Sequence, residues 1–176
     1  VEYLKETVRL GGGLDEDHNL SLDAMQRGCD CLARFAERLG GFSHAQVRAV
    51  ATQTLREANN REAFLHRGSE VLGHAIDLVS GPEEARLIYV GVAHTLPNPH
   101  KQQLVVDIGG GSTEFVIGKS FKPIALESLY MGCVSYSMRY FPEGRIDKRG
   151  LRDAELAAQK EIQTITHAYR EVSWDE

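Results

Sequence analysis

Asp107-Ile-Gly-Gly-Gly-Ser-Thr-Glu114 is the most informative local pattern in this chain, because three successive glycines join two apolar runs. Residues 104–108 lead into it and residues 115–117 lead out of it, which is the pattern of a β-hairpin. Glycine has no Cβ, so the backbone N–H groups at the bend can approach a bound anion closely. The stretch therefore predicts a hairpin whose loop binds phosphate.

Two carboxylates flank the glycines, Asp107 before them and Glu114 after them. They would repel a phosphate unless a magnesium ion bridges them to it, usually through water. Ser112 and Thr113 add hydroxyl donors. The alternative is a glycine-rich turn with solvated acids. The nucleotide-binding pattern GxxxxGKS/T is absent and no helix follows the loop directly, which excludes the common P-loop.

A second signal is Ser80-Gly-Pro-Glu-Glu-Ala-Arg86, where a strand pattern gives way to a helix pattern. Ser80 and Glu83 have the spacing of a capping box, so Glu83 has a structural explanation. Glu84 has two explanations that the sequence leaves open. A carboxylate in the first turn suits the helix dipole, and it can also orient a water molecule as a general base. Arg86 is expected to point elsewhere and to pair with a neighbouring acid.

A third signal is Thr52-Gln-Thr-Leu-Arg56, which follows a predicted strand. The carboxyl ends of strands are where α/β sheets place their ligand contacts. Arg56 can grip a phosphate with two hydrogen bonds, although an ordinary surface arginine explains it equally well. The seven histidines show no HxxxH or HExxH spacing, so none is assigned to a metal.

Strand and helix patterns alternate along the 176 residues, then a hairpin appears, then helices again. This order predicts an α/β fold with a mixed sheet. Ser21 is expected to cap one helix, while Asn59 or Asn60 caps another that Gly73 ends. The expected strands are residues 1–10, 46–54, 75–79, 104–108, 115–117 and 124–129. The expected helices are residues 21–39, 61–72, 80–95, 134–140 and 151–169, with a linker at Pro97-Asn98-Pro99-His100.

The overall charge makes several classes of partner poor candidates. The formal net charge is −5 and no basic run of five or more residues is present, which argues against a nucleic-acid polymer or an anionic membrane as partner. No apolar stretch approaches the ~20 residues of a membrane span. Three cysteines without a CxxC pair argue against a disulfide framework and a zinc ribbon. The cytoplasm is the expected location.

With these signals in order, the chain resembles the exopolyphosphatase/guanosine pentaphosphate phosphohydrolase family. That family belongs to the actin-like, sugar-kinase and heat-shock-chaperone superfamily. The glycine loop alone would indicate only the superfamily, and the Glu-Glu-Ala-Arg helix start narrows it. The matching segments are Arg9-Leu10 with Gly13-Leu14, Ala36-Glu-Arg-Leu, Thr54-Leu-Arg56, Ser80-Gly-Pro-Glu-Glu-Ala-Arg86-Leu-Ile, Val106-Asp-Ile-Gly-Gly-Gly-Ser-Thr-Glu114 and Met131-Gly-Cys-Val134.

The resemblance implies a duplicated ribonuclease-H-like architecture, here incomplete, with the active site between the two halves. Residues 1–95 would be the remainder of the first half, 96–103 a linker and 104–176 the start of the second. It also implies that Glu84 is the catalytic base, that Asp107 and Glu114 position Mg²⁺, and that Arg56 contacts the substrate. The expected phosphate ligands, through their N–H groups and the Ser112 hydroxyl, are Gly109, Gly110, Gly111, Ser112 and Thr113.

The implied reaction is hydrolysis of the terminal phosphoanhydride of inorganic polyphosphate. The close alternative is removal of the 5′ γ-phosphate from guanosine pentaphosphate by the same residues. More distant alternatives are a phosphotransferase of the same superfamily and a non-catalytic nucleotide-binding module. The family's earlier Asp-x-Gly-Ser-Asn-Ser loop is absent, so the chain is expected to be a fragment that is nearly inactive alone. A homodimer is expected by resemblance only.

Overall fold

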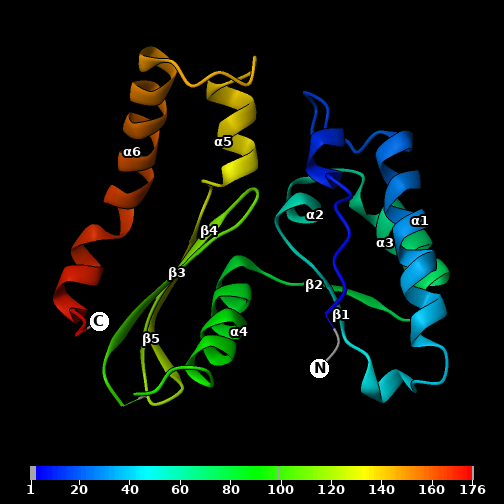
Figure 1. Cartoon of the computed structure of the whole chain (residues 1–176), viewed down its shortest axis with the longest axis horizontal. Helices are drawn as coiled ribbons and strands as arrows, with labels where there is room; N and C mark the ends of the chain where they lie inside the picture. Colours follow the sequence, from blue (N-terminus) through cyan, green and yellow to red (C-terminus); the bar gives the residue numbers. More distant parts are fainter. Residues whose placement is uncertain (1–2, 99, 176) are drawn as a thin grey trace. The chain divides into compact units, whose positions relative to one another are not determined.

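The computed structural model describes residues 3–98 and 100–175. The chain divides into two compact units, residues 1–79 and 80–176, and each has its own hydrophobic core (Figure 1). Val1, where one strand is predicted to begin, and Pro99 of the predicted linker lie outside the described residues. None of the helices in the described ranges is both long enough and apolar enough to span a membrane.

The first unit contains three α-helices and a short parallel sheet. Its elements are η1 (Leu10–Gly13), α1 (Leu22–Leu39), η2 (His44–Gln46), β1 (Ala49–Ala51), α2 (Gln53–Glu57), α3 (Arg61–Leu72) and β2 (Ile76–Leu78). Ser21 caps α1 by accepting a hydrogen bond from the Ala24 N–H, and Gly73 ends α3 with a φ of 75°, as predicted. Asn60 precedes α3 but does not cap it through its side chain, because that amide binds the backbone of Leu20 instead.

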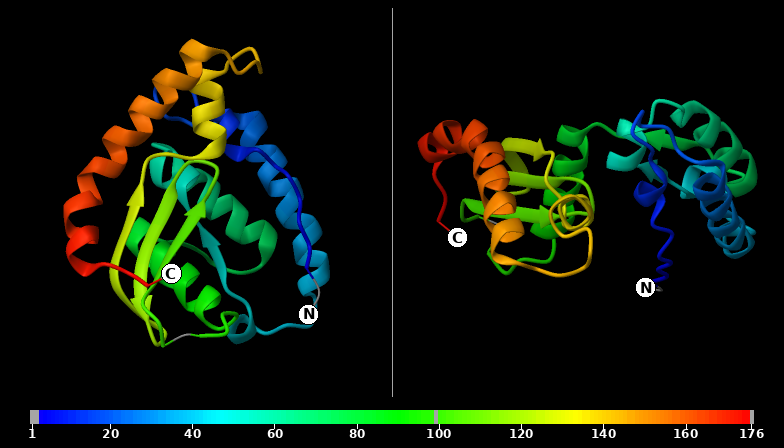
Figure 2. Two further views of the ribbon diagram at one scale, coloured as in Figure 1. Left: turned by 60° about the vertical axis from the view of Figure 1, so that its left-hand side comes forward. Right: turned by 90° about the horizontal axis from the view of Figure 1, so that it is seen from above.

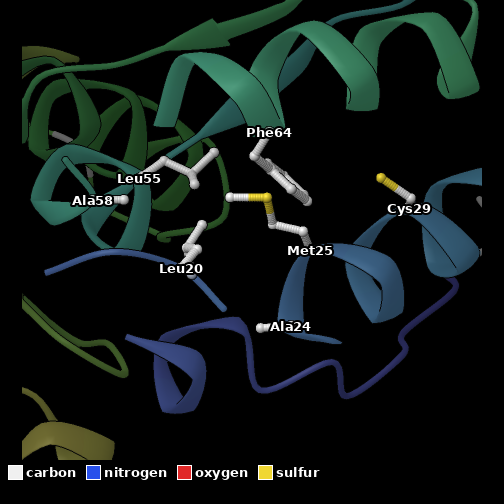
Figure 3. Packing of buried hydrophobic residues seen from close by; sticks show 7 residues of the cluster. All are labelled: Leu20, Ala24, Met25, Cys29, Leu55, Ala58 and Phe64. Atoms are coloured by element: carbon white, nitrogen blue, oxygen red, sulfur yellow. The ribbon is translucent and has the colours of Figure 1, made fainter. Parts of the chain in front are cut away.

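The core of the first unit forms where α1 meets α2 and α3. Figure 3 shows that the buried side chains converge from these helices and from residues that flank α1 and α2; they are Leu20, Ala24, Met25, Cys29, Leu55, Ala58 and Phe64. The strand predicted at residues 1–10 is wrong over its described part. Residues 3–9 join no ladder within the described ranges, and a strand requires a neighbour for its backbone hydrogen bonds.

The second unit is an antiparallel sheet with helices on both faces (Figure 2). Its elements are α4 (Gly81–Ala93), β3 (Gln103–Ile108), β4 (Thr113–Lys119), β5 (Lys122–Leu129), α5 (Cys133–Tyr140) and α6 (Lys148–Val172), with the strand order β3-β4-β5. One parallel and one antiparallel sheet confirm the predicted α/β class with mixed sheets.

The two compact units divide between Val79 and Ser80, so α4 belongs to the second unit. The reason is packing, because α4 buries Ala85, Tyr89 and Ala93 in one core with Val116 of β4. The division into two ribonuclease-H-like halves at the linker 96–103 stays a prediction.

Alternation along β4 places successive side chains on opposite faces of this sheet. Val116 faces α4, whereas Ile117 packs with Ile165 and Tyr169 of α6.

Two buried tyrosines, Tyr89 of α4 and Tyr169 of α6, differ in their hydrogen bonding. The Tyr169 hydroxyl donates to the Phe115 carbonyl at 2.6 Å, whereas the Tyr89 hydroxyl has no hydrogen-bond partner among the described residues. Burial raises the pKa of both phenols, so both stay neutral near pH 7.

We therefore expect Tyr89→Phe to raise the free energy of unfolding, because a buried hydroxyl without a partner costs about 1–3 kcal/mol. Tyr169→Phe is the matched control on the opposite face and should lower that free energy, because it removes a hydrogen bond that is made. Thermal or urea unfolding of the two variants measures both effects. A loss of stability in Tyr89→Phe would show that its hydroxyl does find a partner.

Candidate active site

The β3–β4 hairpin brings the two predicted carboxylates together. Asp107 lies directly opposite Glu114, and Glu114 lies directly opposite Ser128 of β5. Residues opposite one another on antiparallel strands project to the same face, with Cβ atoms about 4.5–5.5 Å apart. Glu114 lies two residues before Val116, so this face is the one that α4 covers. Asp107, Glu114 and Ser128 thus form one row across the sheet, which we call the carboxylate row.

Glu114 is an unusual member of this row because its residue is only 2% exposed. Its Oε1 atom accepts a hydrogen bond from the Ser128 hydroxyl at 2.8 Å, and no described basic side chain forms an ion pair with it. A buried carboxylate paired only with a neutral hydroxyl is costly as an anion. Asp107, opposite it, is exposed. The row therefore offers carboxylate oxygens whose negative charge no described basic side chain neutralises. Such oxygens suit a hard cation.

The described residues contain no cluster of three or more metal-binding side chains. Mg²⁺ keeps several waters and is usually bound through one or two carboxylates together with substrate phosphates. Asp107 and Glu114 are two carboxylates on one face of the sheet, and their role as metal ligands stays a prediction.

The glycine loop is held from one side by the start of α5. The Cys133 N–H donates to the Gly109 carbonyl at 2.9 Å. The Val134 and Ser135 N–H groups both donate to the Gly110 carbonyl, at 2.9 and 3.0 Å. The first amides of α5 therefore bind the loop, and they are not available to an anion.

These contacts fix the direction of the loop's own N–H groups. A trans peptide is planar, so its N–H points away from its C=O. The Gly109 and Gly110 carbonyls point at α5, and the N–H groups of Gly110 and Gly111 in the same two peptides must therefore point away from it. Gly110 is exposed. The two N–H groups form a small donor site on the open side of the loop.

Two of the predicted phosphate ligands have other partners. The Gly109 N–H donates to the Ser112 carbonyl at 2.9 Å and closes the turn. The Thr113 hydroxyl donates to the Met131 carbonyl, and Thr113 itself is buried. Thr113 faces away from the carboxylate row because it is adjacent to Glu114 in a strand. The Thr113 hydroxyl is thus engaged within the fold, and a phosphate contact through the Thr113 N–H stays a prediction.

Helix α4 begins as the sequence predicts, apart from one detail. The Ser80 hydroxyl accepts the Glu83 N–H at 3.3 Å. The Glu83 carboxylate does not complete a capping box; it forms two hydrogen bonds with Arg86, at 2.7 and 2.8 Å. Arg86 thereby lowers the pKa of Glu83. This confirms that Arg86 pairs with a neighbouring acid, and Glu83 is occupied by that pair.

Gly81 brings the start of α4 against the carboxylate row. A Cβ built on Gly81 would lie 2.6 Å from the Ser128 Cβ and 2.9 Å from its hydroxyl oxygen. Glu84 follows Gly81 by three residues, which places both on the same side of the helix. The second unit therefore assembles Glu84, Asp107, Glu114 and the glycine loop around one end of its sheet.

Arg56 belongs to the first unit, whereas the glycine loop and Glu84 belong to the second. Its guanidinium donates to the Val79 carbonyl at 3.1 Å and to the Gln53 side chain at 2.8 Å. These bonds tie α2 to the residue after β2. Its role as a phosphate ligand stays a prediction.

Sequence reasoning missed three residues that shape this site: Gly81, Ser128 and Gly132. A Cβ on Gly132 would lie 2.4 Å from Gly110 and Gly111 backbone atoms, so its small size allows α5 to reach the loop. Gly81 and Gly132 each stand at the start of a helix, which is a signal that could have drawn attention to them. Ser128 carries no local signal.

Comparisons with known proteins, by sequence and by structure, relate the chain to the same protein family. The family model described as Ppx/GppA phosphatase matches residues 1–176. Over 172 residues the chain is 48% identical to the guanosine-5′-triphosphate,3′-diphosphate pyrophosphatase of Vibrio cholerae. The matched region covers 98% of the chain and 34% of that relative.

Two solved structures share the fold over nine-tenths of the chain. An exopolyphosphatase-like protein superposes with a TM-score of 0.81 at 28% identity, covering 90% of the chain and 51% of that protein. The Ppx/GppA family member of Aquifex aeolicus superposes with a TM-score of 0.70 at 30% identity, covering 90% and 51%. The chain thus spans about a third of the length of the first relative and half of these two.

Proposed function

The chain belongs to the Ppx/GppA phosphatase family, and we propose that the protein containing it removes the terminal 5′ phosphate of guanosine 5′-triphosphate 3′-diphosphate. The family resemblance puts inorganic polyphosphate first as substrate, but no sequence pattern separates the two substrates. The name of the 48% identical relative favours the guanosine substrate instead. Both substrates present a chain of phosphoanhydrides, and both reactions release orthophosphate.

The observation that carries the proposal is the placing of three kinds of group at one end of a single sheet. The Gly110 and Gly111 N–H groups offer donors to a phosphate. The carboxylate row lies beside them. Glu84 lies in the first turn of the helix that packs against that row, where it can accept the proton of an attacking water. Water attack on the terminal phosphorus then breaks the bridging P–O bond and yields orthophosphate.

Asp107 and Glu114 are the residues that would hold Mg²⁺ at this site. When bound, the ion would neutralise charge on the phosphate oxygens and help to orient the substrate. The protein's own part is to hold the two carboxylates on one face and the loop donors beside them. The cytoplasmic location and the homodimer stay predictions.

Inorganic polyphosphate remains the second candidate for a specific reason. The donors that the loop offers are backbone N–H groups, which recognise phosphate and not a nucleobase. A solved relative at a TM-score of 0.81 is also described as exopolyphosphatase-like. The test is a side-by-side measurement of kcat/KM for phosphate release from both substrates, using the full-length protein with Mg²⁺. A higher value for polyphosphate would reverse the order of the two candidates, and release from neither would refute the activity.

A substitution in the loop tests whether it binds phosphate. We expect Gly110→Val to raise KM strongly, because its methyl groups would press on Val134 at the start of α5 and displace the loop that carries the N–H donors. The fold has room for the first carbon, since a Cβ at Gly110 would lie 3.6 Å from Val134, an ordinary contact. Gly110→Ala is the milder control. An unchanged KM in Gly110→Val would show that the loop is only a turn.

A further inference from the structure

Ser128 contacts both Glu114 and the start of α4. Its hydroxyl donates to Glu114 Oε1 at 2.8 Å, and its Cβ and oxygen fill the space where Gly81 lacks a side chain. Ser128 lies opposite Glu114 on the neighbouring strand, so the hydrogen bond runs across the sheet within the carboxylate row. No other described side chain hydrogen-bonds to Glu114.

This hydrogen bond restricts what the Glu114 carboxylate can do. A glutamate side chain has three rotatable bonds, and its last torsion is broad unless a partner fixes it. The Ser128 proton occupies one oxygen of the carboxylate and leaves the other oxygen for a cation or its water. Since Glu114 is 2% exposed, bulk water offers little competition for these positions.

We propose that Ser128 is a positioning residue that holds the Glu114 carboxylate in the orientation that binds the metal ion and sets the distance of α4 from it. The inference rests on the proposed metal-dependent function. Ser128 is not expected to touch the substrate; it acts through Glu114 on one side and through Gly81, three residues before Glu84, on the other.

A packing role alone would explain the contact of Ser128 with Gly81. It would not explain the hydrogen bond from the Ser128 hydroxyl to Glu114. Packing requires only a side chain of this volume, which cysteine or alanine nearly supplies. Positioning requires a donor aimed at Oε1. The two explanations therefore separate when the hydroxyl is removed and the packing is kept.

The experiment measures Mn²⁺ binding to the full-length protein by electron paramagnetic resonance, with orthophosphate in place of substrate. We expect Ser128→Ala to bind Mn²⁺ about 10- to 100-fold more weakly than the wild type, the usual effect of removing a hydrogen bond to a metal ligand. Its melting temperature should fall modestly, because the buried Glu114 carboxylate loses its hydrogen-bond partner while the packing volume is nearly kept. Equal Mn²⁺ affinity in the wild type and Ser128→Ala would overturn the proposal.

A compensating pair keeps the result independent of folding. Gly81→Ala should lower the melting temperature, because its Cβ would lie 2.6 Å from the Ser128 Cβ. Adding Ser128→Gly to Gly81→Ala removes that clash and should restore much of the melting temperature, while Mn²⁺ affinity stays low. Recovery of both quantities in the double variant would show that packing alone matters and would overturn the proposal.

The same data separate this inference from the proposed function. A wild-type protein that hydrolyses substrate but binds no Mn²⁺ would refute the metal site and this proposal with it, while leaving the hydrolase activity standing. Tight wild-type binding that Ser128→Ala does not weaken would refute only the role of Ser128.

Discussion

Glu84→Gln is expected to lower the rate of phosphate release by about 10²–10⁴-fold, because the amide cannot take a proton from the attacking water. The substitution keeps the shape of the side chain, so KM and the melting temperature should change far less than kcat. Glu84 lies in the first turn of α4, where losing a negative charge costs stability by about 0.3–1 kcal/mol. The measurement is orthophosphate release by the full-length protein with Mg²⁺.

Glu83→Gln is the matched control for this experiment. It removes the same charge from the same helical turn, so it reproduces the effect on the helix dipole. Its carboxylate is bound to Arg86, which leaves it without a catalytic role in our proposal. We expect its rate to stay within a few-fold of the wild type. Near-normal turnover in Glu84→Gln, or an equal loss in both variants, would refute Glu84 as the base.

The parts of the site that the sequence predicted well are local in the chain. The hairpin around Gly109–Gly111, the facing pair Asp107 and Glu114, and the cap at Ser80 all follow from residues within a few positions of one another. Their turn and cap chemistry is determined by neighbouring residues, and apolar alternation sets the strand faces. The same holds for α1 and α3, whose ends follow from Ser21 and Gly73.

The parts that escaped prediction depend on contacts between distant segments. Ser128 is fourteen residues from Glu114, and nothing near it in the sequence indicates a bond to a buried carboxylate. The direction of the loop N–H groups depends on α5, more than twenty residues beyond Gly109. The orientation of Thr113 away from the row follows from strand alternation, but the choice of hydroxyl partner required the structure.

The packing of α4 illustrates a related limit. Pro97-Asn98-Pro99-His100 has the composition of a linker. Composition describes a break in local structure, however, and says nothing of which core a helix joins. For α4 that core is identified by Tyr89, whose ring fills the place where Gly118 of β4 has no side chain. A Cβ built on Gly118 would lie only 2.2 Å from that ring.

Gly132→Ala is the second substitution from which we expect a large loss. The backbone at Gly132 has φ −142° and ψ 158°, which any residue adopts, so backbone strain is not the reason. The reason is space, because the new Cβ would lie 2.4 Å from backbone atoms of Gly110 and Gly111. Neither backbone can yield like a flexible side chain, so α5 and the loop must separate.

Separation would break the hydrogen bonds from α5 that turn the Gly110 and Gly111 N–H groups toward the open side. Losing one such pre-oriented donor costs about 10²–10³-fold in rate in comparable sites, so we expect kcat/KM to fall by about 10²-fold or more. Overpacking should also lower the free energy of unfolding by about 1–3 kcal/mol. Steady-state kinetics and thermal unfolding of the full-length protein measure the two effects separately.

Gly91→Ala is the matched control, since it makes the same substitution inside α4 where a Cβ would meet nothing within 4 Å. Alanine is the better helix former, so this variant should gain about 0.5–1 kcal/mol in stability and keep its activity. If Gly132→Ala is also as active as the wild type, then α5 does not orient the loop. The Gly110 and Gly111 N–H groups would then owe their direction to the hairpin alone, and the phosphate site would be a property of the glycine sequence and not of its packing.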